Sequence, residues 1–127
     1  MARVLVAEDD AQMRRLVVEA LREAGHSVAE VKDGRALLER LAETFARDPS
    51  LSPVDVIVTD IRMPACNGLE LLEHLVDAGL RVRCVLMTAF GDEETRRRAH
   101  NAGALFLDKP LSLQALRDAV EWLVRRP

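Results

Sequence analysis

The sequence predicts a doubly wound α/β domain, in which helices cover both faces of a five-stranded parallel sheet. Five short aliphatic runs of strand length alternate along the chain with five segments of helical spacing. Most runs are apolar at nearly every position, which is typical of strands buried on both faces of a sheet. Since right-handed crossovers join parallel strands, this strict alternation of strand and helix favours the doubly wound arrangement.

Length and composition indicate one domain over residues 1–127. A chain of 127 residues, of which 49% are apolar, can bury one core but is too short for two ordinary ones. The one long irregular link runs from Arg47 to Pro53 and contains two prolines, which resist both helix and strand. We therefore expect this link to be a surface loop within the domain.

The five expected strands are the aliphatic runs, taken in chain order. They are Val4–Ala7, Ser27–Val31, Val54–Val58, Val82–Met87 and Ala104–Leu107. The second is the weakest prediction because Glu30 interrupts its apolar character.

Helical spacing gives most of the five helices an apolar face that can pack on the sheet. The face of the first helix consists of Met13, Leu16, Val17, Ala20, Leu21 and Ala24. The second helix, from about Gly34 to Ala46, has Leu37, Leu38, Leu41 and Phe45. The third begins near Gly68 and has Leu72, Leu75 and Val76. The fourth, from about Asp92 to Asn101, is more polar, and the fifth has Leu113, Leu116, Val120 and Leu123.

Residues with strong preferences for helix ends mark several boundaries. Asp9 or Asp10 can cap the first helix, and Ser112 can cap the fifth, because a short polar side chain accepts hydrogen bonds from unpaired backbone amides. Glycines follow the first, third and fourth helices, at Gly25, Gly79 and Gly103. These glycines predict where the helices stop.

Composition excludes several function classes. The net charge of −3 gives no overall field for nucleic acid or an anionic membrane, and aromatic residues are only 3% of the chain. No apolar stretch approaches the roughly 20 residues of a membrane span, and no signal peptide fits the N-terminus. Cys66 and Cys84 form no metal-binding or disulfide pattern. We expect a cytoplasmic protein without membrane contact and without direct nucleic-acid binding.

Polar residues follow four of the predicted strands, where an open α/β sheet carries its ligand crevice. These residues are Glu8-Asp9-Asp10, Thr59-Asp60, Thr88 and Asp108-Lys109-Pro110. Because neighbouring strands lie about 4.8 Å apart, side chains at their ends can converge on one small ligand. Lys109 is one of only two lysines in the chain.

Carboxylates crowded at these strand ends need a cation to neutralise their charge. Glu8, Asp9 and Asp60 would raise one another's pKa unless a hard divalent ion such as Mg²⁺ neutralised them. Mg²⁺ bound by carboxylates keeps positions open for phosphate oxygens. A carboxylate can then accept a phosphoryl group, with Lys109 balancing charge and Thr88 donating a hydrogen bond.

Four segments together resemble the response-regulator receiver domain (CheY-like). They are Val4-Leu5-Val6-Ala7-Glu8-Asp9-Asp10, Val56 to Pro64 followed by Asn67-Gly68, Met87-Thr88-Ala89 and Asp108-Lys109-Pro110. The resemblance covers essentially the whole chain. It implies a flavodoxin-like sheet of strand order 2-1-3-4-5 and a phosphoryl group accepted from a sensor histidine kinase or a His-containing phosphotransfer domain.

The resemblance also implies roles for the acidic residues. Asp60 matches the aspartate that is phosphorylated, Asp9 a direct Mg²⁺ ligand, and Glu8 the acid that holds a metal-bound water. Arg62 would offer its backbone carbonyl to the metal. Glu8 stands where aspartate is commoner in the family, which lengthens this acid by one methylene.

Further roles carried by the resemblance concern switching. Thr88 matches the hydroxyl that turns toward the phosphoryl group, Lys109 the lysine that contacts it, and Phe106 the aromatic residue that moves with the hydroxyl. Phe106 replaces the more frequent tyrosine. The Lys109–Pro110 bond is expected to be cis, as is common in the family.

The resemblance places the output and dimerisation surface on the fourth helix, fifth strand and fifth helix. A homodimer formed on phosphorylation and an effector domain or protein are therefore expected partners. Arg96-Arg97-Arg98 on the fourth helix is either part of this surface or a solvated face. Trp122 on the fifth helix either flanks the surface or lies at the edge of the core.

The resemblance implies a signalling domain that assists its own phosphorylation and dephosphorylation, and not an enzyme. One alternative is a Mg²⁺-dependent aspartyl-phosphate phosphatase, but such enzymes place a second acid two residues after the nucleophile, where this chain has Arg62. A second alternative is a pseudo-receiver that acts only by binding, which the complete set of site residues disfavours. No nucleotide-binding motif occurs.

Two bulky residues predict a long-lived phosphorylated state. Arg62 and Phe90 each follow a site residue by two positions, where they can obstruct an attacking water. Cys66 and Cys84 are interpreted as bystanders, and the three histidines, His26, His74 and His100, are too scattered to form a ligand set.

Overall fold

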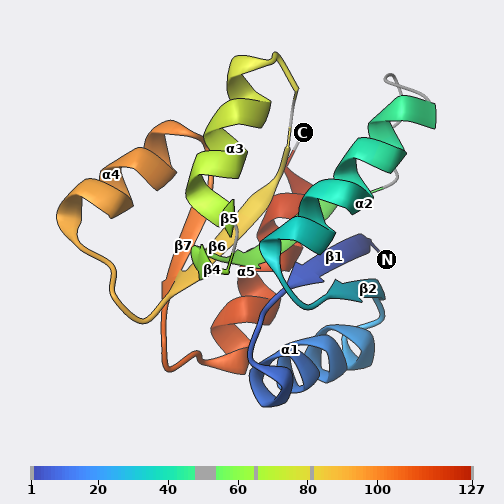
Figure 1. Cartoon of the computed structure of the whole chain (residues 1–127). Coiled ribbons are helices and arrows are strands. Elements are labelled where there is room, and N and C mark those ends of the chain that lie inside the picture. Colours follow the sequence, from blue (N-terminus) through green and yellow to red (C-terminus); the bar gives the residue numbers. More distant parts are fainter. Residues whose placement is uncertain (1, 48–53, 65, 81, 127) are drawn as a thin grey trace.

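The described residues form a five-stranded parallel sheet, which Figure 1 shows with helices around it. A computed structural model describes residues 2–47, 54–64, 66–80 and 82–126, and the side chains of all of these except residues 44–47. The sheet comprises β1 (Arg3–Ala7), β2 (Ser27–Val31), β3 (Val56–Asp60), β6 (Cys84–Thr88) and β7 (Leu105–Asp108), in the order β2-β1-β3-β6-β7. Because β6 and β7 are the fourth and fifth long strands, this is the predicted order 2-1-3-4-5, and the predicted fold class is confirmed.

Helices lie on both faces of the sheet. They are α1 (Ala11–Glu23), α2 (Gly34–Arg47), α3 (Gly68–Asp77), α4 (Glu93–Asn101) and α5 (Leu113–Arg125). α1 and α5 cover one face, and α2, α3 and α4 cover the other (Figure 1). Among the residues that the structure describes, no helix has the length and apolar character needed to cross a membrane.

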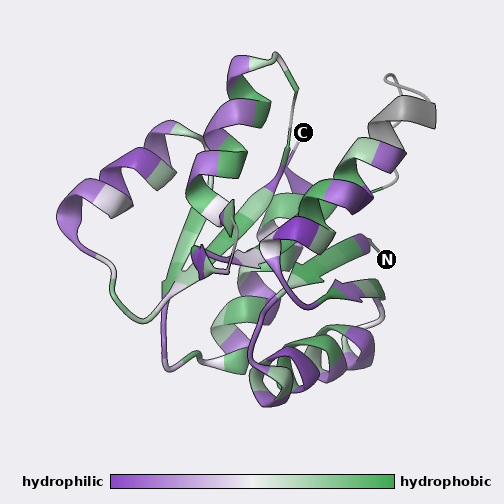
Figure 2. Ribbon diagram, viewed as in Figure 1, coloured by the Kyte–Doolittle hydropathy of each residue, from purple (hydrophilic) through white to green (hydrophobic). Residues whose placement is uncertain are grey.

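Alternate residues of each central strand enter two different cores. Val56 and Val58 of β3 pack beneath α1 and α5, whereas Ile57 packs beneath α2 and α3. Every residue of β3 and of β6 is buried. Figure 2 accordingly shows apolar strands inside and mixed helices outside. The edge strand β2 is only half-buried, which explains its weaker sequence pattern.

The helix ends follow the predicted capping chemistry. Asp10 caps α1 by accepting a hydrogen bond from the Met13 amide at 3.0 Å, which decides between the two candidates Asp9 and Asp10. Ser112 caps α5 by accepting from the Ala115 amide at 3.1 Å. Positive φ angles follow three helices, with values of 95°, 80° and 81° at Gly25, Gly79 and Gly103. The Lys109–Pro110 peptide bond is cis, as predicted.

Several predicted details were wrong. The third and fourth long strands begin two residues later than predicted. They extend through Asp60 and Thr88 because these polar residues still pair with the neighbouring strands. Three leucine and valine positions assigned to apolar helix faces are exposed instead, at Leu16, Leu38 and Val76. The predicted loop from Arg47 to Pro53, apart from its first residue, and the side chain of Phe45 lie outside the described residues.

A two-stranded antiparallel hairpin after β3 was not predicted. It consists of β4 (Arg62–Met63) and β5 (Cys66–Asn67). Strands of two residues carry no periodic pattern, so the sequence gives no signal for them beyond the Asn67-Gly68 pair that begins α3.

Candidate functional site

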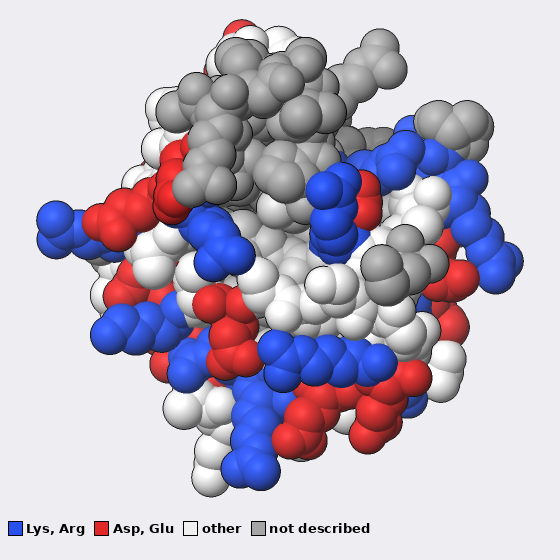
Figure 3. Space-filling view, turned by 90° about the vertical axis from the view of Figure 1, so that its right-hand side faces the viewer, with Lys and Arg blue, Asp and Glu red and all other residues white. Residues whose placement is uncertain are grey.

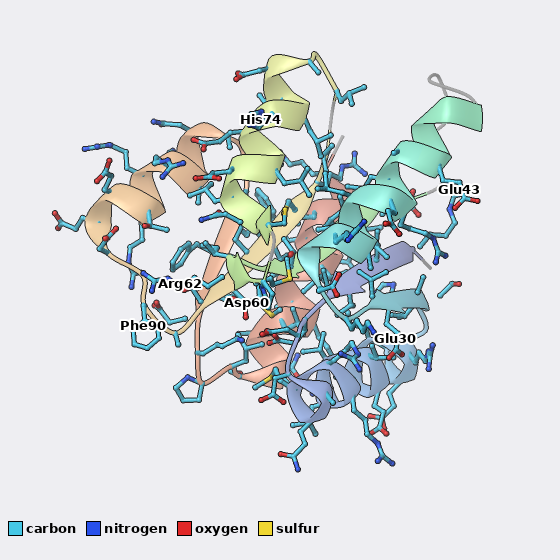
Figure 4. The ribbon with its side chains drawn as sticks, in the orientation of Figure 1. Glu30, Glu43, Asp60, Arg62, His74 and Phe90 are labelled. Carbon is cyan, nitrogen blue, oxygen red and sulfur yellow. The ribbon has the colours of Figure 1, made fainter. Side chains whose placement is uncertain are left out.

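Three carboxylates converge at the side of the sheet where the strands have their carboxyl ends. Oxygen atoms of Glu8, Asp9 and Asp60 all lie within 4.8 Å of one another. Glu8 and Asp9 follow β1, and Asp60 ends the neighbouring strand β3, so the parallel pairing of β1 with β3 brings them together. The Glu8 side chain is fully buried, Asp60 is 6% exposed, and Asp9 is open to solvent. Figure 4 shows Asp60 at this central edge.

Lys109 is the cation of this cluster. Its ammonium group donates hydrogen bonds to Glu8 Oε1 at 2.5 Å and to Asp60 Oδ2 at 2.8 Å. Lys109 follows β7, and its backbone amide donates a hydrogen bond to the Thr88 carbonyl at 2.8 Å. This bond holds the backbone of Lys109 at the end of β6. The structure thus joins residues separated by about a hundred positions in the chain.

Burial and crowding change how Glu8 ionises. Burial raises the pKa of Glu8 from 4.5 to about 7; a hydrogen bond with Asp9 and the charge of Asp60 also raise it, while Lys109 lowers it. For Lys109, burial lowers the pKa, but its hydrogen bonds with Asp60 and Glu8 outweigh this effect and leave it raised. At Glu8, Lys109 therefore offsets only part of the effect of burial.

The carboxylate cluster suits a hard cation. Three carboxylates that converge within 4.8 Å supply the oxygen ligands that Mg²⁺ prefers. Burial, and to a lesser degree the charge of Asp60, raises the pKa of Glu8, and a bound cation would favour its ionised form. No other group of three or more acidic, histidine or cysteine side chains with this spacing occurs among the described residues, and His26, His74 and His100 belong to none.

Thr88 ends β6 close to this cluster. Its side chain is buried, and its hydroxyl accepts a hydrogen bond from the Phe90 amide at 3.2 Å. Thr88 is paired with Asp108, the residue before Lys109, in the register of β6 with β7. The hydroxyl and the ammonium group therefore come from adjacent strand ends.

The hairpin β4–β5 begins two residues after Asp60 and packs closely against its surroundings. The Arg62 amide donates to Asp60 Oδ1 at 3.2 Å. A β-carbon placed on Gly68 would lie 2.5 Å from the Asp60 carbonyl oxygen, and one placed on Gly34 would lie 2.0 Å from Cys66 Cβ. Both glycines are therefore needed for close backbone approach around the acidic residue.

Two bulky side chains flank the site at its solvent side. The Arg62 guanidinium carbon lies 5.3 Å from the centre of the Phe90 ring, and Phe90 is 69% exposed. Figure 4 shows both residues to the left of Asp60, with Phe90 below Arg62. That this pair prolongs the phosphorylated state stays a prediction.

Arg14 is a site neighbour that sequence reasoning missed. It lies on α1, donates from Nη1 to the Glu8 carbonyl at 2.9 Å, and contacts Glu30 of β2 at 3.3 Å. An arginine in the first turns of an amphipathic helix carries no sequence signal for this role. Its contacts hold the backbone at the end of β1, from which Glu8 and Asp9 project.

The other residues considered in the sequence analysis lie in three settings: ion-paired, exposed or buried. Arg96 and Arg98 make ion pairs within the fold, and Trp122 is 52% exposed, with the Arg126 guanidinium 5.1 Å from its ring centre. Cys84 is buried, which raises its pKa to about 12 and leaves the thiol unreactive. On the face drawn in Figure 3, side chains of both charges intermingle instead of gathering by sign.

Comparisons with known proteins agree with this geometry. The family model described as "Response regulator receiver domain" matches residues 4–121. The transcriptional regulatory protein PdtaR of Mycobacterium tuberculosis is 36% identical over 126 residues, covering 98% of this chain and 57% of PdtaR. The response regulator receiver protein CpdR of Brucella abortus is 32% identical over 127 residues, covering 95% of each chain.

A solved structure shows the same arrangement of elements. The receiver domain of the Francisella response regulator 1452 superposes with a TM-score of 0.85 at 26% identity, covering 99% of this chain and 98% of that one. The chain spans little more than half the length of PdtaR but nearly all of CpdR. From its sequence match, its fold and its carboxyl-edge site, the chain belongs to the response regulator receiver domain family.

Proposed function

We propose that this chain is a phosphoacceptor switch, in which Asp60 accepts a phosphoryl group from a phosphohistidine of a sensor histidine kinase or a His-containing phosphotransfer domain. The observation that carries the proposal is the position of the Asp60 carboxylate. It lies within 4.8 Å of the Glu8 and Asp9 oxygens and 2.8 Å from the Lys109 ammonium group. This combination offers a nucleophile, metal ligands and a compensating cation in one place.

Receiver domains generally bind Mg²⁺ at an acidic pocket, and the same cluster would hold the ion here. We assign Asp9 and Asp60 as direct ligands, the Arg62 backbone carbonyl as a third, and Glu8 as the acid that holds a metal-bound water. When bound, Mg²⁺ would neutralise charge on the phosphoryl oxygens.

The proposed reaction is a direct displacement at phosphorus. An oxygen of Asp60 forms a bond to phosphorus, the bond from phosphorus to the histidine nitrogen breaks, and that nitrogen keeps the electron pair. Lys109 already hydrogen-bonds Asp60 Oδ2. Its ammonium group then moves from the carboxylate to a phosphoryl oxygen, where it balances the added charge.

Switching follows from Thr88 and Phe106. The Thr88 hydroxyl accepts a hydrogen bond from Phe90 in this structure, and after phosphorylation it turns to donate to the phosphoryl group. Phe106 follows into the space that the hydroxyl leaves. The surface of α4, β7 and α5 changes as a result and controls an effector domain or protein, or a homodimer.

Phosphorylation with a small phosphodonor tests the assignment. Wild-type protein incubated with acetyl phosphate and Mg²⁺ should gain one acid-labile phosphoryl group by intact-mass spectrometry, and Asp60→Asn should gain none. Asp55→Asn is the matched control, because Asp55 precedes the opposite end of β3 and pairs with Arg3. Equal labelling of Asp60→Asn and wild type would remove Asp60 from the proposal.

The phosphatase alternative lacks support at the position where it needs a second acid. Arg62 occupies that position, and its guanidinium group stacks on Phe90. We propose instead that this pair restricts water at the phosphoryl group and prolongs the phosphorylated state. For the pseudo-receiver alternative we find no favouring observation among the described residues.

The setting of the switch is a further part of the proposal. We place the domain at residues 1–127 and the protein in the cytoplasm, where histidine kinases present their phosphorylated residue. PdtaR extends well beyond the region that this chain matches, and we propose that an effector acts with this domain. Blotting of fractionated cells with an antibody against the chain tests the location.

A further inference from the structure

Helix α4 is attached to the fold mainly through charged groups. All residues of α4 are described, and of these only Ala99 is buried. Arg98 pairs with Glu73 of α3, and Arg96 pairs with Asp108 of β7. Because so little apolar surface is buried beneath it, the position of α4 depends on these arginine contacts.

Arg96 contacts two residues of β7 at once. Its Nη2 atom donates to both carboxylate oxygens of Asp108, at 3.0 and 2.9 Å, and its guanidinium carbon lies 5.0 Å from the centre of the Phe106 ring. Phe106 and Asp108 are two positions apart in the strand and therefore point to the same side. The guanidinium group spans both side chains and fixes the ring relative to α4.

Gly91 contributes the other wall around the ring. A β-carbon placed there would lie 2.5 Å from Phe106 Cζ, 2.9 Å from Cε1 and 3.1 Å from Thr88 Cγ2. Gly91 has no positive φ, so its backbone conformation is open to any residue and the constraint comes from the ring. Phe106 thus occupies a slot between Gly91 and Arg96, and we call this the ring slot.

We propose that Arg96 is the latch of the ring slot, a positioning residue that holds Phe106 in its unphosphorylated position and so sets how readily the domain switches. The inference rests on the proposed function, because it assumes that Phe106 moves when Thr88 turns to the phosphoryl group. It adds two residues, Arg96 and Gly91, to which that function assigned no role. Arg96 acts by raising the free energy needed to move the Phe106 ring away from α4.

The latch should have a measurable but moderate effect. A partly exposed ion pair and a cation–π contact together favour the closed arrangement by about fivefold. A phosphoryl mimic that needs the ring to move must overcome this preference, so its apparent affinity is reduced by the same factor. Removal of the latch therefore increases apparent affinity without changing any group in the acidic cluster.

The test compares Arg96→Gln with Arg97→Gln. Arg97 is the next residue along α4, is exposed, and makes no ion pair with any residue that the structure describes. Arg97→Gln therefore removes the same positive charge as Arg96→Gln without removing an ion pair. Apparent affinity for beryllofluoride in the presence of Mg²⁺ should rise about fivefold in Arg96→Gln and stay at the wild-type value in Arg97→Gln. Equal affinity of the two variants, or weaker binding by Arg96→Gln, overturns the latch.

A second readout follows the ring without any phosphoryl mimic. Fluorophenylalanine labels the three phenylalanines, and Phe106→Ala identifies the ¹⁹F resonance of the slot. In the metal-free protein, Arg96→Gln should shift or broaden this resonance, whereas Arg97→Gln should leave it unchanged. An unchanged resonance in Arg96→Gln overturns the latch even if wild type fails to bind beryllofluoride, which would count against the proposed function instead.

Gly91→Ala tests the slot by a different route. The added methyl group should displace the ring and shift the same resonance, and it should destabilise the protein less in a Phe106→Ala background than in wild type. Such non-additivity is expected only if Gly91 acts through the ring. Additive effects on urea unfolding, together with an unmoved resonance, contradict the slot.

Discussion

The metal-free protein should lose stability as pH rises from about 5 to about 8, because of Glu8. The fold raises the pKa of this carboxyl from 4.5 to about 7, chiefly by burial. Between these values the folded state binds a proton that the unfolded state has released, so the free energy of unfolding falls as pH rises. The stabilising contribution is complete below 4.5 and is lost as pH rises through about 7.

The size of this effect follows from the pKa difference. A shift from 4.5 to about 7 corresponds to about 3 kcal/mol of unfolding free energy. The raised pKa of Lys109 has no part in this window, because that change lies above its ordinary value of 10.5. Mg²⁺ should reverse the loss, since a cation competes with the proton for the same carboxylates and stabilises the folded state most where they are ionised.

Urea unfolding followed by circular dichroism at several pH values, with EDTA or with excess Mg²⁺, measures this effect. Glu8→Gln should flatten the pH dependence in EDTA, because the carboxamide does not ionise. Glu19→Gln is the matched control, since Glu19 is exposed on α1 and pairs only with Arg15 among the described residues. Identical pH dependence in Glu8→Gln and wild type would refute the assignment of the effect to Glu8.

Three further predictions use the same protein. Gly34→Ala should lower the free energy of unfolding by roughly 1–3 kcal/mol, because the new methyl group meets Cys66 Cβ; an unchanged urea midpoint would contradict this contact. Leu86→Ala should lower it by about 2–5 kcal/mol, because Leu86 is fully buried beneath α3 and α4, and a loss below 1 kcal/mol would argue against that core. Replacing Arg62 and Phe90 together by alanine should speed the decay of phosphorylated protein severalfold, as measured by intact mass over time; equal decay would rule out their shielding role.

Much of the fold was predictable because its signals are local. Apolar runs identify strands buried on both faces, and capping residues such as Asp10 and Ser112 mark helix starts by hydrogen bonds within one turn. The exposure of Leu16 and Leu38 was not predictable, because helical spacing shows which residues share a side but not how wide the buried stripe is. The hairpin β4–β5 was missed because two-residue strands have no period.

The site was predictable at the level of strand ends. Parallel pairing necessarily brings the carboxyl ends of neighbouring strands to one edge, so Glu8, Asp60 and Lys109 could be placed together from their positions after apolar runs. The partners of long side chains were not predictable in the same way. Arg14 and Arg96 reach residues that are distant in the chain, and only the packed structure shows which of many carboxylates and carbonyls each one meets.

The most direct measurement of the central claim locates the phosphoryl group on the chain. Protein treated with acetyl phosphate and Mg²⁺ is reduced with borohydride, which converts an aspartyl phosphate to homoserine, and is then mapped by peptide mass spectrometry. The proposed function predicts homoserine at position 60, with its yield abolished by EDTA and sharply reduced in Lys109→Ala. Homoserine at Asp9 or Asp55 and not at Asp60, or an equal yield in EDTA, would contradict it.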